Sequence, residues 1–336
     1  MLNLEALLSN LQSQPIKPSG GRILAIPIPG YERHRIALDD DGSPTILIAI
    51  QPKTASTAPL MIQLEHLQVE SDVSSQVTQA IEVTGIDGVV EEGTFTFITC
   101  CNADAGLHRY FLQIMEPIIG MLGPTPKRSD VTRAVLNLVE LFRIMTRPSR
   151  GTVQGLWAEL FLIARAPEVA PLVKSWHVEP EDTYDFNSGN QRLEVKSVSG
   201  RVRRHVFSLV QLLPPTGTTA LFASVFVERA GDGTSLGELV ETVRNRVSSD
   251  LDLMMAVDKI VALTLGNSLR QALEERFDYQ LAKQSLAFYK VDDVPSISSD
   301  IPHEVSGVHF TSDITGAQTI DVKLHRREGG LFAAVL

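Results

Sequence analysis

The sequence has little cysteine and no long uncharged hydrophobic run. Its two cysteines, Cys100 and Cys101, are adjacent, and adjacent cysteines rarely pair with each other, so a secreted disulfide framework is excluded. We expect both to be core or strand residues. No stretch reaches about 18 uncharged apolar residues. The nearest candidate, residues 111–123, is interrupted by Glu116 and Pro117, which argues against a membrane-spanning helix and a membrane partner.

Several motifs that carry familiar chemistry are also absent. The sequence has no GxxxxGK[ST] loop, GxGxxG turn, HExxH, CxxC pair or GxSxG elbow, and its histidines show no zinc-ligand spacing. The motifs that usually carry out Walker-type nucleotide hydrolysis, dinucleotide redox chemistry and zinc proteolysis are therefore missing from the sequence. Residues 1–14 contain Glu5 and no basic residue, unlike a secretory signal peptide. We expect a soluble cytoplasmic protein.

Bulk charge excludes indiscriminate coating of nucleic acid. The chain has 30 basic and 40 acidic residues, a formal net charge of −10, so any nucleic-acid contact must come from a local patch. Hydrophobic residues make up 43% and charged residues 21%, which is ordinary globular composition. A length of 336 residues corresponds to roughly two domains.

Residues 1–150 are predicted to form an α+β domain. The acidic turn 39–42 lacks the later ligands of a calcium loop, so we interpret it as a turn only. Gly123 to Pro126 and the Arg-Pro-Ser-Arg-Gly segment 147–151 predict chain breaks, the second a domain boundary near Arg150. The apolar patterns predict strands at 21–28, 45–50 and 94–99 and helices at 107–122 and 130–145.

Residues 151–336 are predicted to form an α/β domain in which helices flank a mixed β-sheet. An extended, acid-bearing stretch is expected between the first helix and Asp185, and a short helix or strand end at 208–213. The tail, residues 268–322, is expected to add a helix and short strands. The patterns predict helices at 155–164 and 235–247 and strands at 191–198 and 218–228.

Two acids and a lysine lie around one predicted hairpin. On a strand over 191–198, period two puts Glu194 and Lys196 on one face. A return through the Asn/Gly turn 187–190 would bring Asp185 beside Glu194. Paired carboxylates with a lysine suit a hard divalent cation and a phosphate, although Glu-Val-Lys also occurs on solvated strands.

The preceding helix offers a third acid. Glu159 shares a face with Leu156, Leu160 and Ile163, where a lone carboxylate is costly unless it is paired or binds a cation. The alternative is a salt bridge to an arginine, or a position at the helix edge.

In this order, helix Glu, Asp and Glu-x-Lys, the residues resemble the PD-(D/E)XK nuclease superfamily. The flanking sequence is similar to a bacterial family of PD-(D/E)XK-motif proteins found among restriction and phage-defence genes. Tyr184 stands where the superfamily name has Pro, at a position that varies. The resemblance covers most of 150–320 and rests on these residues: Gly155–Leu160, Trp176, Asp185–Phe186, Glu194–Lys196, His205–Ser208 and Gln211–Leu212.

The resemblance implies a restriction-endonuclease-like core and assigns roles by position. Asp185 and Glu194 would bind Mg²⁺, with Mn²⁺ as a substitute, and Lys196 would be the catalytic lysine. Glu159 would be a further catalytic acid near a second metal. His205 and Gln211 would lie close to the DNA phosphates or orient water.

Residues 200–205 are expected to form a basic loop directly after the Glu-Val-Lys strand, within a basic segment that spans residues 186–205. Residues 186–205 contain five basic residues and one acid, and Arg201, Arg203 and Arg204 are the cluster within it. Beside a metal site, such a cluster favours phosphate contact over the alternative of a solvated turn.

These observations lead to two function hypotheses. The first is a Mg²⁺-dependent DNA endonuclease of a bacterial restriction or anti-phage defence system, with DNA and other defence proteins as partners. Cutting both strands would favour a homodimer. The second is a non-cleaving subunit that binds DNA or a protein partner through a nuclease-like fold, since fold alone does not establish activity. A weaker alternative is a scaffold that assembles through residues 1–150.

Overall fold

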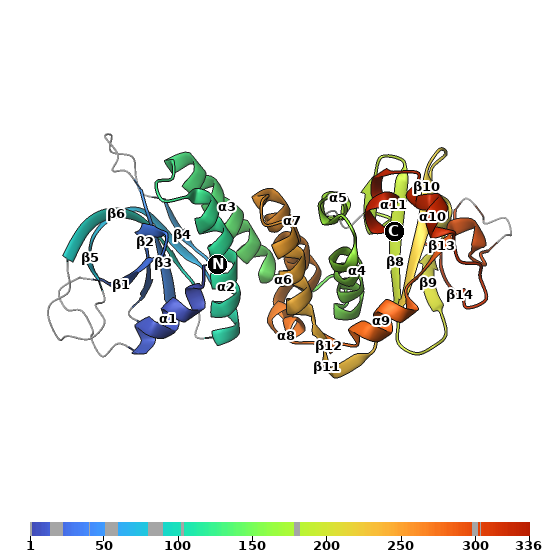
Figure 1. Ribbon diagram of the computed structural model, residues 1–336, viewed down its shortest axis with the longest axis horizontal. Coiled ribbons are helices and arrows are strands. Elements are labelled where there is room, and N and C mark those ends of the chain that lie inside the picture. Colours follow the sequence, from blue (N-terminus) through green and yellow to red (C-terminus); the bar gives the residue numbers. More distant parts are fainter. Residues whose placement is uncertain are drawn as a thin grey trace. The chain divides into compact units, whose positions relative to one another are not determined.

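The structure is a computed structural model that describes residues 2–13, 23–39, 41–50, 60–79, 90–101, 104–177, 182–297, 302 and 304–336 (Figure 1). The chain divides into two compact units, Met1–Ile144 and Met145–Leu336. Within the described ranges, no helix is long and apolar enough to cross a membrane.

The first unit contains a six-stranded sheet that closes on itself. The strands follow the order β1-β2-β3-β6-β5-β4, and β1 also pairs in parallel with β5. Apolar residues of β1, β2, β3 and β6, including Leu47 and Phe95, form a buried cluster. The strands are β1 (Ile23–Ile28), β2 (Tyr31–Leu38), β3 (Pro44–Ala49), β4 (Met61–Gln63), β5 (Gln68–Gln79) and β6 (Val90–Thr99).

Three helices accompany this sheet: α1 (Leu4–Ser13), α2 (Ala105–Leu122) and α3 (Arg128–Met145). Asp104 caps α2, because its Oδ1 accepts the Leu107 N–H at 2.8 Å. Asp39 Oδ1 likewise accepts the backbone N–H groups of Asp41 and Ser43, as the interpretation of an ordinary turn requires. Asp40, the middle acid, lies outside the described residues.

The second unit is built around a four-stranded mixed sheet of order β13-β10-β8-β7. Strands β8 and β10 are parallel, and the other two pairings are antiparallel. Two ribbons, β11 with β12 and β9 with β14, complete the strands. The strands are β7 (Phe186–Ser188), β8 (Gln191–Val198), β9 (Arg204–Ser208), β10 (Thr219–Phe226), β11 (Arg229–Ser235), β12 (Arg276–Phe277), β13 (Ala287–Lys290) and β14 (His309–Asp313).

Helices flank this sheet, and α4, α6 and α7 pack side by side (Figure 1). Helix α6 begins with a capping box in which Ser235 and Glu238 exchange side-chain to backbone hydrogen bonds. The predicted α/β class with helices flanking a mixed sheet is confirmed. The helices are α4 (Val153–Arg165), α5 (Val169–Ser175), η1 (Leu209–Leu212), α6 (Leu236–Arg246), α7 (Leu251–Leu265), η2 (Gly266–Ser268), α8 (Leu269–Leu273), α9 (Tyr279–Ser285), η3 (Val291–Asp293), α10 (Val322–Arg326) and α11 (Gly330–Val335).

Two local predictions were wrong. The stretch before Asp185, expected to be extended, contains α5, which buries Val169, Leu172 and Val173. The basic segment was expected to be a loop, but Arg204 and His205 begin β9, whose partner β14 lies about a hundred residues further along the chain.

Candidate metal centre

The candidate site is built from one helix and one hairpin of the second unit. Helix α4 is capped by Thr152, whose Oγ1 accepts the Gly155 N–H at 3.0 Å. Trp157 and Phe161 are buried and stack on each other with ring centroids 5.5 Å apart. This packing fixes the rotation of α4, and Glu159 faces Trp176 and Asp185.

The hairpin brings the two predicted acids together. Strands β7 and β8 are antiparallel with Phe186 opposite Leu193, and Gly189 adopts a φ of 52° in the turn. The Asp185 N–H donates to Glu194 Oε2 at 3.2 Å, and Asp185 Oδ2 accepts the Val195 N–H at 2.7 Å. The expected juxtaposition of Asp185 and Glu194 through this turn is therefore confirmed.

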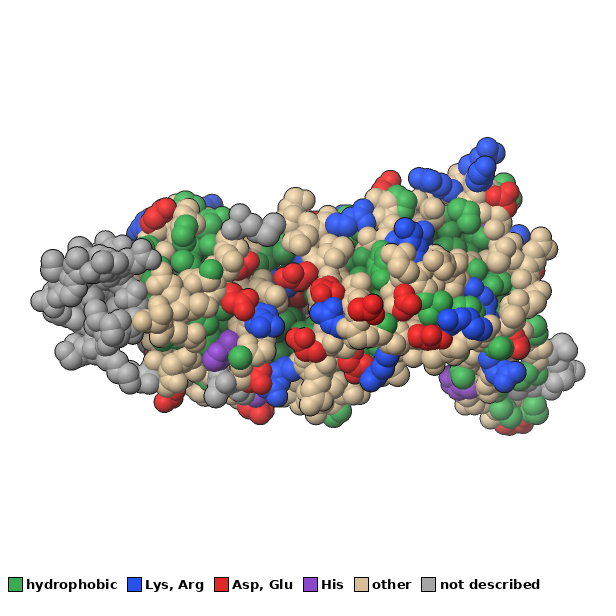
Figure 2. Space-filling model, turned by 60° about the horizontal axis from the view of Figure 1, so that its bottom comes forward, with side chains coloured by type: hydrophobic (Ala, Val, Ile, Leu, Met, Phe, Trp, Pro, Cys, Tyr) green, Lys and Arg blue, Asp and Glu red, His purple; other side chains and the backbone are tan. Residues whose placement is uncertain are grey.

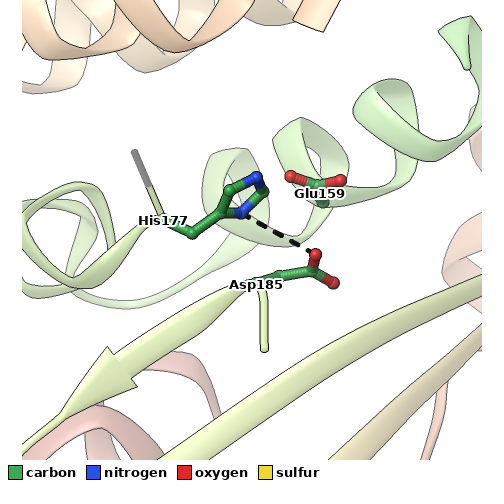
Figure 3. A group of neighbouring side chains, drawn as sticks. All are labelled: Glu159, His177 and Asp185. Atoms are coloured by element: carbon green, nitrogen blue, oxygen red, sulfur yellow. Dashed lines mark ion pairs between the residues drawn. The ribbon is translucent and has the colours of Figure 1, made fainter. Parts of the chain in front are cut away.

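A third side chain, His177, completes a group of potential metal ligands. Glu159, His177 and Asp185 each offer one ligand atom, and these three atoms lie within 4.8 Å of one another (Figure 3). His177 Nδ1 lies 3.9 Å from Asp185 Oδ1, and the backbone N–H of His177 donates to the backbone carbonyl oxygen of Asp185 at 2.8 Å. Trp176 Nε1 donates to Glu159 Oε2 at 2.7 Å. The three groups converge on one space.

The electrostatics of this group favour a cation. Burial raises the pKa of Glu159 to about 7, which the Trp176 hydrogen bond opposes and the charge of Glu194 reinforces. Burial also raises the pKa of Asp185 well above its usual range, and the charges of Glu194 and Glu159 add to the effect. Carboxylates held together in this way are stabilised by a positive ion between them.

The residues present fit a divalent metal ion. His177 Nδ1 is buried and makes no hydrogen bond to any residue that the structure describes. Two carboxylate oxygens and an imidazole nitrogen are a donor set for a small divalent cation, with carboxylates suited to Mg²⁺ and Mn²⁺. A divalent cation would give this buried nitrogen a partner and would favour the charged forms of the two acids beside it, whose pKa values are raised.

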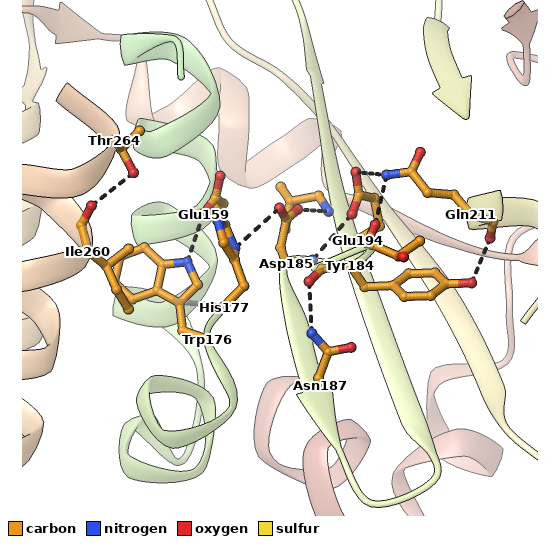
Figure 4. Close-up of polar contacts among 12 residues, drawn as sticks. Glu159, Trp176, His177, Tyr184, Asp185, Asn187, Glu194, Gln211, Ile260 and Thr264 are labelled. Atoms are coloured by element: carbon orange, nitrogen blue, oxygen red, sulfur yellow. Dashed lines mark hydrogen bonds and ion pairs between the residues drawn. The ribbon is translucent and has the colours of Figure 1, made fainter. Parts of the chain in front are cut away.

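The other two motif residues, Glu194 and Lys196, form an adjoining polar network, of which Figure 4 shows Glu194 with Gln211. Glu194 Oε1 lies 2.7 Å from Lys196 Nζ and accepts from Gln211 Nε2 at 2.7 Å. Lys196 Nζ also donates to Gln211 Oε1 at 3.1 Å. Gln211 belongs to η1, the short helix that follows β9, and its side chain therefore joins both members of Glu-x-Lys.

His177 was missed at the sequence level. It lies 18 residues after Glu159 and 8 before Asp185, and no short motif connects the three. The available signal was indirect: Trp176, which precedes it, was part of the resemblance, and in the structure Trp176 forms a bridge with Phe186 across the hairpin strand. That bridge aligns His177 with Asp185.

Two arginines of the basic segment are paired with acids from elsewhere in the chain. Arg201 pairs with Glu228 at 2.5 Å, and Arg204 lies 3.7 Å from Asp313. Basic and acidic side chains are interspersed on the face shown in Figure 2, with no continuous basic surface. The local excess of positive charge counted along the sequence is therefore smaller in space.

Two of the predicted DNA-binding residues have structural contacts. His205 is 3% exposed, and its Nε2 lies 2.8 Å from Ser224 Oγ. Arg203 Nη1 donates to the Ser224 carbonyl and hydroxyl oxygens, and its guanidinium lies 4.5 Å from the Phe226 ring centroid. In this arrangement His205 cannot reach a phosphate directly, because its side chain is buried and its Nε2 contacts Ser224 of β10.

A mixed sheet flanked by helices, with Asp185 directly before the edge strand β7 and Glu-x-Lys on the neighbouring strand β8, defines a nuclease-like protein of the PD-(D/E)XK class. The family model described as "Putative PD-(D/E)XK family member, (DUF4420)" matches residues 9–315. The chain belongs to this family, so the suspected superfamily is confirmed. No curated protein and no solved structure matches the chain.

Proposed function

We propose that the protein is a Mg²⁺- or Mn²⁺-dependent deoxyribonuclease that hydrolyses phosphodiester bonds, in a bacterial restriction or anti-phage defence system. The observation that carries the proposal is the convergence of Glu159, His177 and Asp185 beside the Glu194–Lys196 pair. The defence role rests on the sequence resemblance alone.

In this proposal Glu159, His177 and Asp185 hold the cation, with Glu194 as the adjoining acid. The cation supplies Lewis-acid chemistry: it neutralises charge on the phosphate and makes water a stronger acid. The Val195 N–H holds Asp185 Oδ2, so the other oxygen, Oδ1, is the one that faces His177. The hairpin backbone thereby orients this carboxylate.

Lys196 supplies the positive charge that the transition state requires. Its side chain is 17% exposed, so it can contact a phosphate while remaining largely shielded from bulk water. Glu194 and Gln211 hold Nζ in place, which leaves the third donor position of the ammonium for a phosphate oxygen. Negative charge that develops on the phosphate during hydrolysis is then stabilised by a fixed donor.

The test is cleavage of DNA by the purified full chain with Mg²⁺ or Mn²⁺. We expect cleavage that EDTA abolishes and that the Asp185→Asn variant lacks while it still unfolds cooperatively. DNA binding without cleavage by wild type, in either metal, would instead support the alternative of a non-cleaving subunit. Equal cleavage by wild type and Asp185→Asn would contradict the site.

A further inference from the structure

A pocket of about 310 Å³ adjoins the candidate metal centre within the second unit. It lies between one face of α4 and one face of α7. Its lining from α7 is Ile260, Leu263 and Thr264, at helical spacing of three and four. The remaining lining residues come from α4 and the segment before it, together with His177, and two of them belong to the metal group: Arg150, Gly151, Thr152, Gly155, Leu156, Glu159 and His177.

The pocket continues from the metal group along α4. Thr152 and Glu159 are seven residues apart, so the lined face is about 10 Å long at 1.5 Å per residue. Glu159 and His177 belong to both the metal group and the pocket lining. A ligand in the pocket would therefore lie next to a phosphate at the cation. Figure 4 shows Ile260 and Thr264 near the Glu159 side of the site.

The lining has the chemistry of a site for one nucleotide. Leu263 is half-buried and offers apolar surface for a base or a deoxyribose, and Leu156 and Ile260, which also line the pocket, are almost fully buried. Arg150 is exposed and has no ion-pair partner among the described residues, unlike Arg201 and Arg204 of the basic segment. A guanidinium in this position is suited to a phosphate.

The size of the pocket limits what can enter. Its volume is at the lower end of the roughly 300–1,000 Å³ of small-molecule sites, so it suits a single nucleotide and not a base pair. A base within a duplex is stacked and paired, and must be unpaired before it can enter such a pocket. Gly155 adds no side chain to the lining, and a Cβ there would lie 3.0 Å from Thr152 Oγ1, the atom that caps α4.

We propose that this pocket holds an unpaired nucleotide next to the scissile phosphate, with Arg150 on its phosphate. The inference rests on the proposed nuclease function and adds its substrate class: single-stranded DNA, or DNA with unpaired nucleotides, in preference to continuous duplex.

The first experiment measures cleavage of a single strand, a duplex of the same sequence, and that duplex with one unpaired nucleotide. We expect kcat/KM for the single strand and for the duplex with one unpaired nucleotide to be at least about tenfold higher than for the continuous duplex. This factor is at the low end of the binding free energy gained when one base stacks on a protein side chain. Leu263→Trp, which fills the pocket, should remove this preference. Arg150→Ala should raise KM, and Arg147→Ala, an exposed arginine outside the lining, should match wild type.

The second experiment measures binding of thymidine 5′-monophosphate by calorimetry, in EDTA, so that it needs no cleavage. We expect binding by wild type and Arg147→Ala, and binding at least about fivefold weaker for Leu263→Trp and Arg150→Ala. Circular dichroism and cooperative melting check that both pocket variants fold. Because Arg150 is exposed, its variant remains informative if Leu263→Trp misfolds.

The outcomes separate the two proposals. Metal-dependent cleavage with equal rates on all three DNAs, unchanged in Leu263→Trp, would overturn the pocket assignment and leave the nuclease function standing. Nucleotide binding that depends on Leu263 and Arg150, without cleavage of any DNA, would sink the nuclease proposal and retain a nucleotide pocket. Absence of both activities would overturn both.

Discussion

Glu194 Oε1 and Lys196 Nζ are 2.7 Å apart on the same face of β8, and both side chains are largely buried. Period two along the strand puts them side by side, and Gln211 joins them from η1. The pair is therefore preorganised, and its lysine needs no large movement to meet a phosphate.

We expect Lys196→Met to lower kcat for DNA cleavage by a factor of about 10²–10⁴, the range for a positioned catalytic group. Metal binding should persist, because Lys196 is not among the three potential ligands. Cleavage rates and Mn²⁺ titration of the same protein check both statements. Lys174→Met, at an exposed position on α5, is the matched control and should cleave as wild type does. Undiminished cleavage by Lys196→Met would remove this lysine from the mechanism.

Gln211 acts through Glu194 and Lys196, as a positioning residue. We expect Gln211→Leu to lower kcat at least about tenfold with little change in KM, because Lys196 loses one of its two fixed partners. Tyr184→Phe is the control, since the Tyr184 hydroxyl donates only to the Gln211 backbone carbonyl oxygen, at 2.8 Å. If Tyr184→Phe lowers kcat as much as Gln211→Leu does, the effect comes from movement of η1 and not from the amide.

Glu159 is expected to destabilise the protein when no cation is bound. Its raised pKa shows that the buried carboxylate is less favourable when charged, so Glu159→Gln should raise the melting temperature in EDTA at pH 8. The amide oxygen can still accept from Trp176 Nε1. Mn²⁺ should raise the melting temperature of wild type and not of Glu159→Gln. Glu168→Gln, at an exposed position, controls for loss of charge alone. A lower melting temperature for Glu159→Gln in EDTA would contradict the account.

His205 gives the fold a defined sensitivity to acid. Burial, followed by the charges of Lys196 and Arg203, lowers its pKa from 6.5 to about 4. The folded state therefore binds fewer protons than the unfolded state between these values, and stability falls as pH decreases from 6.5 toward 4. The contribution lost between pH 7 and pH 5 is about 2 kcal/mol.

The measurement is urea unfolding of wild type and His205→Gln at pH 7 and pH 5. Comparing the two proteins cancels the opposing effect of Glu159 and Asp185, whose raised pKa values stabilise the fold as pH falls. We expect His205→Gln to lose about 2 kcal/mol less than wild type over this interval. Identical losses would show that His205 becomes exposed or charged without cost.

The hairpin and the α4 acid were predictable because their signals are local. An Asn/Gly turn, period-two alternation around Glu194 and a capped apolar helix around Glu159 each lie within a few residues of one another. Such patterns depend on backbone geometry that neighbouring residues determine.

The remaining features depend on contacts between distant residues. His177 joins the site only because Trp176 bridges to Phe186. Two arginines of the basic segment, Arg201 and Arg204, pair with Glu228 and Asp313, which no count along the sequence could match to them. Closure of the first sheet through β1 and β5 is likewise a long-range pairing.

The central claim is that Glu159, His177 and Asp185 together hold a divalent cation. Its most direct test is a crystal structure of the protein with Mn²⁺, with the ion located by its anomalous scattering. The account predicts one peak bounded by a carboxylate oxygen of Glu159, a carboxylate oxygen of Asp185 and Nδ1 of His177, each within about 2.5 Å. If a crystal in saturating Mn²⁺ showed no peak among these residues, or showed its peak elsewhere in the second unit, the result would contradict the account.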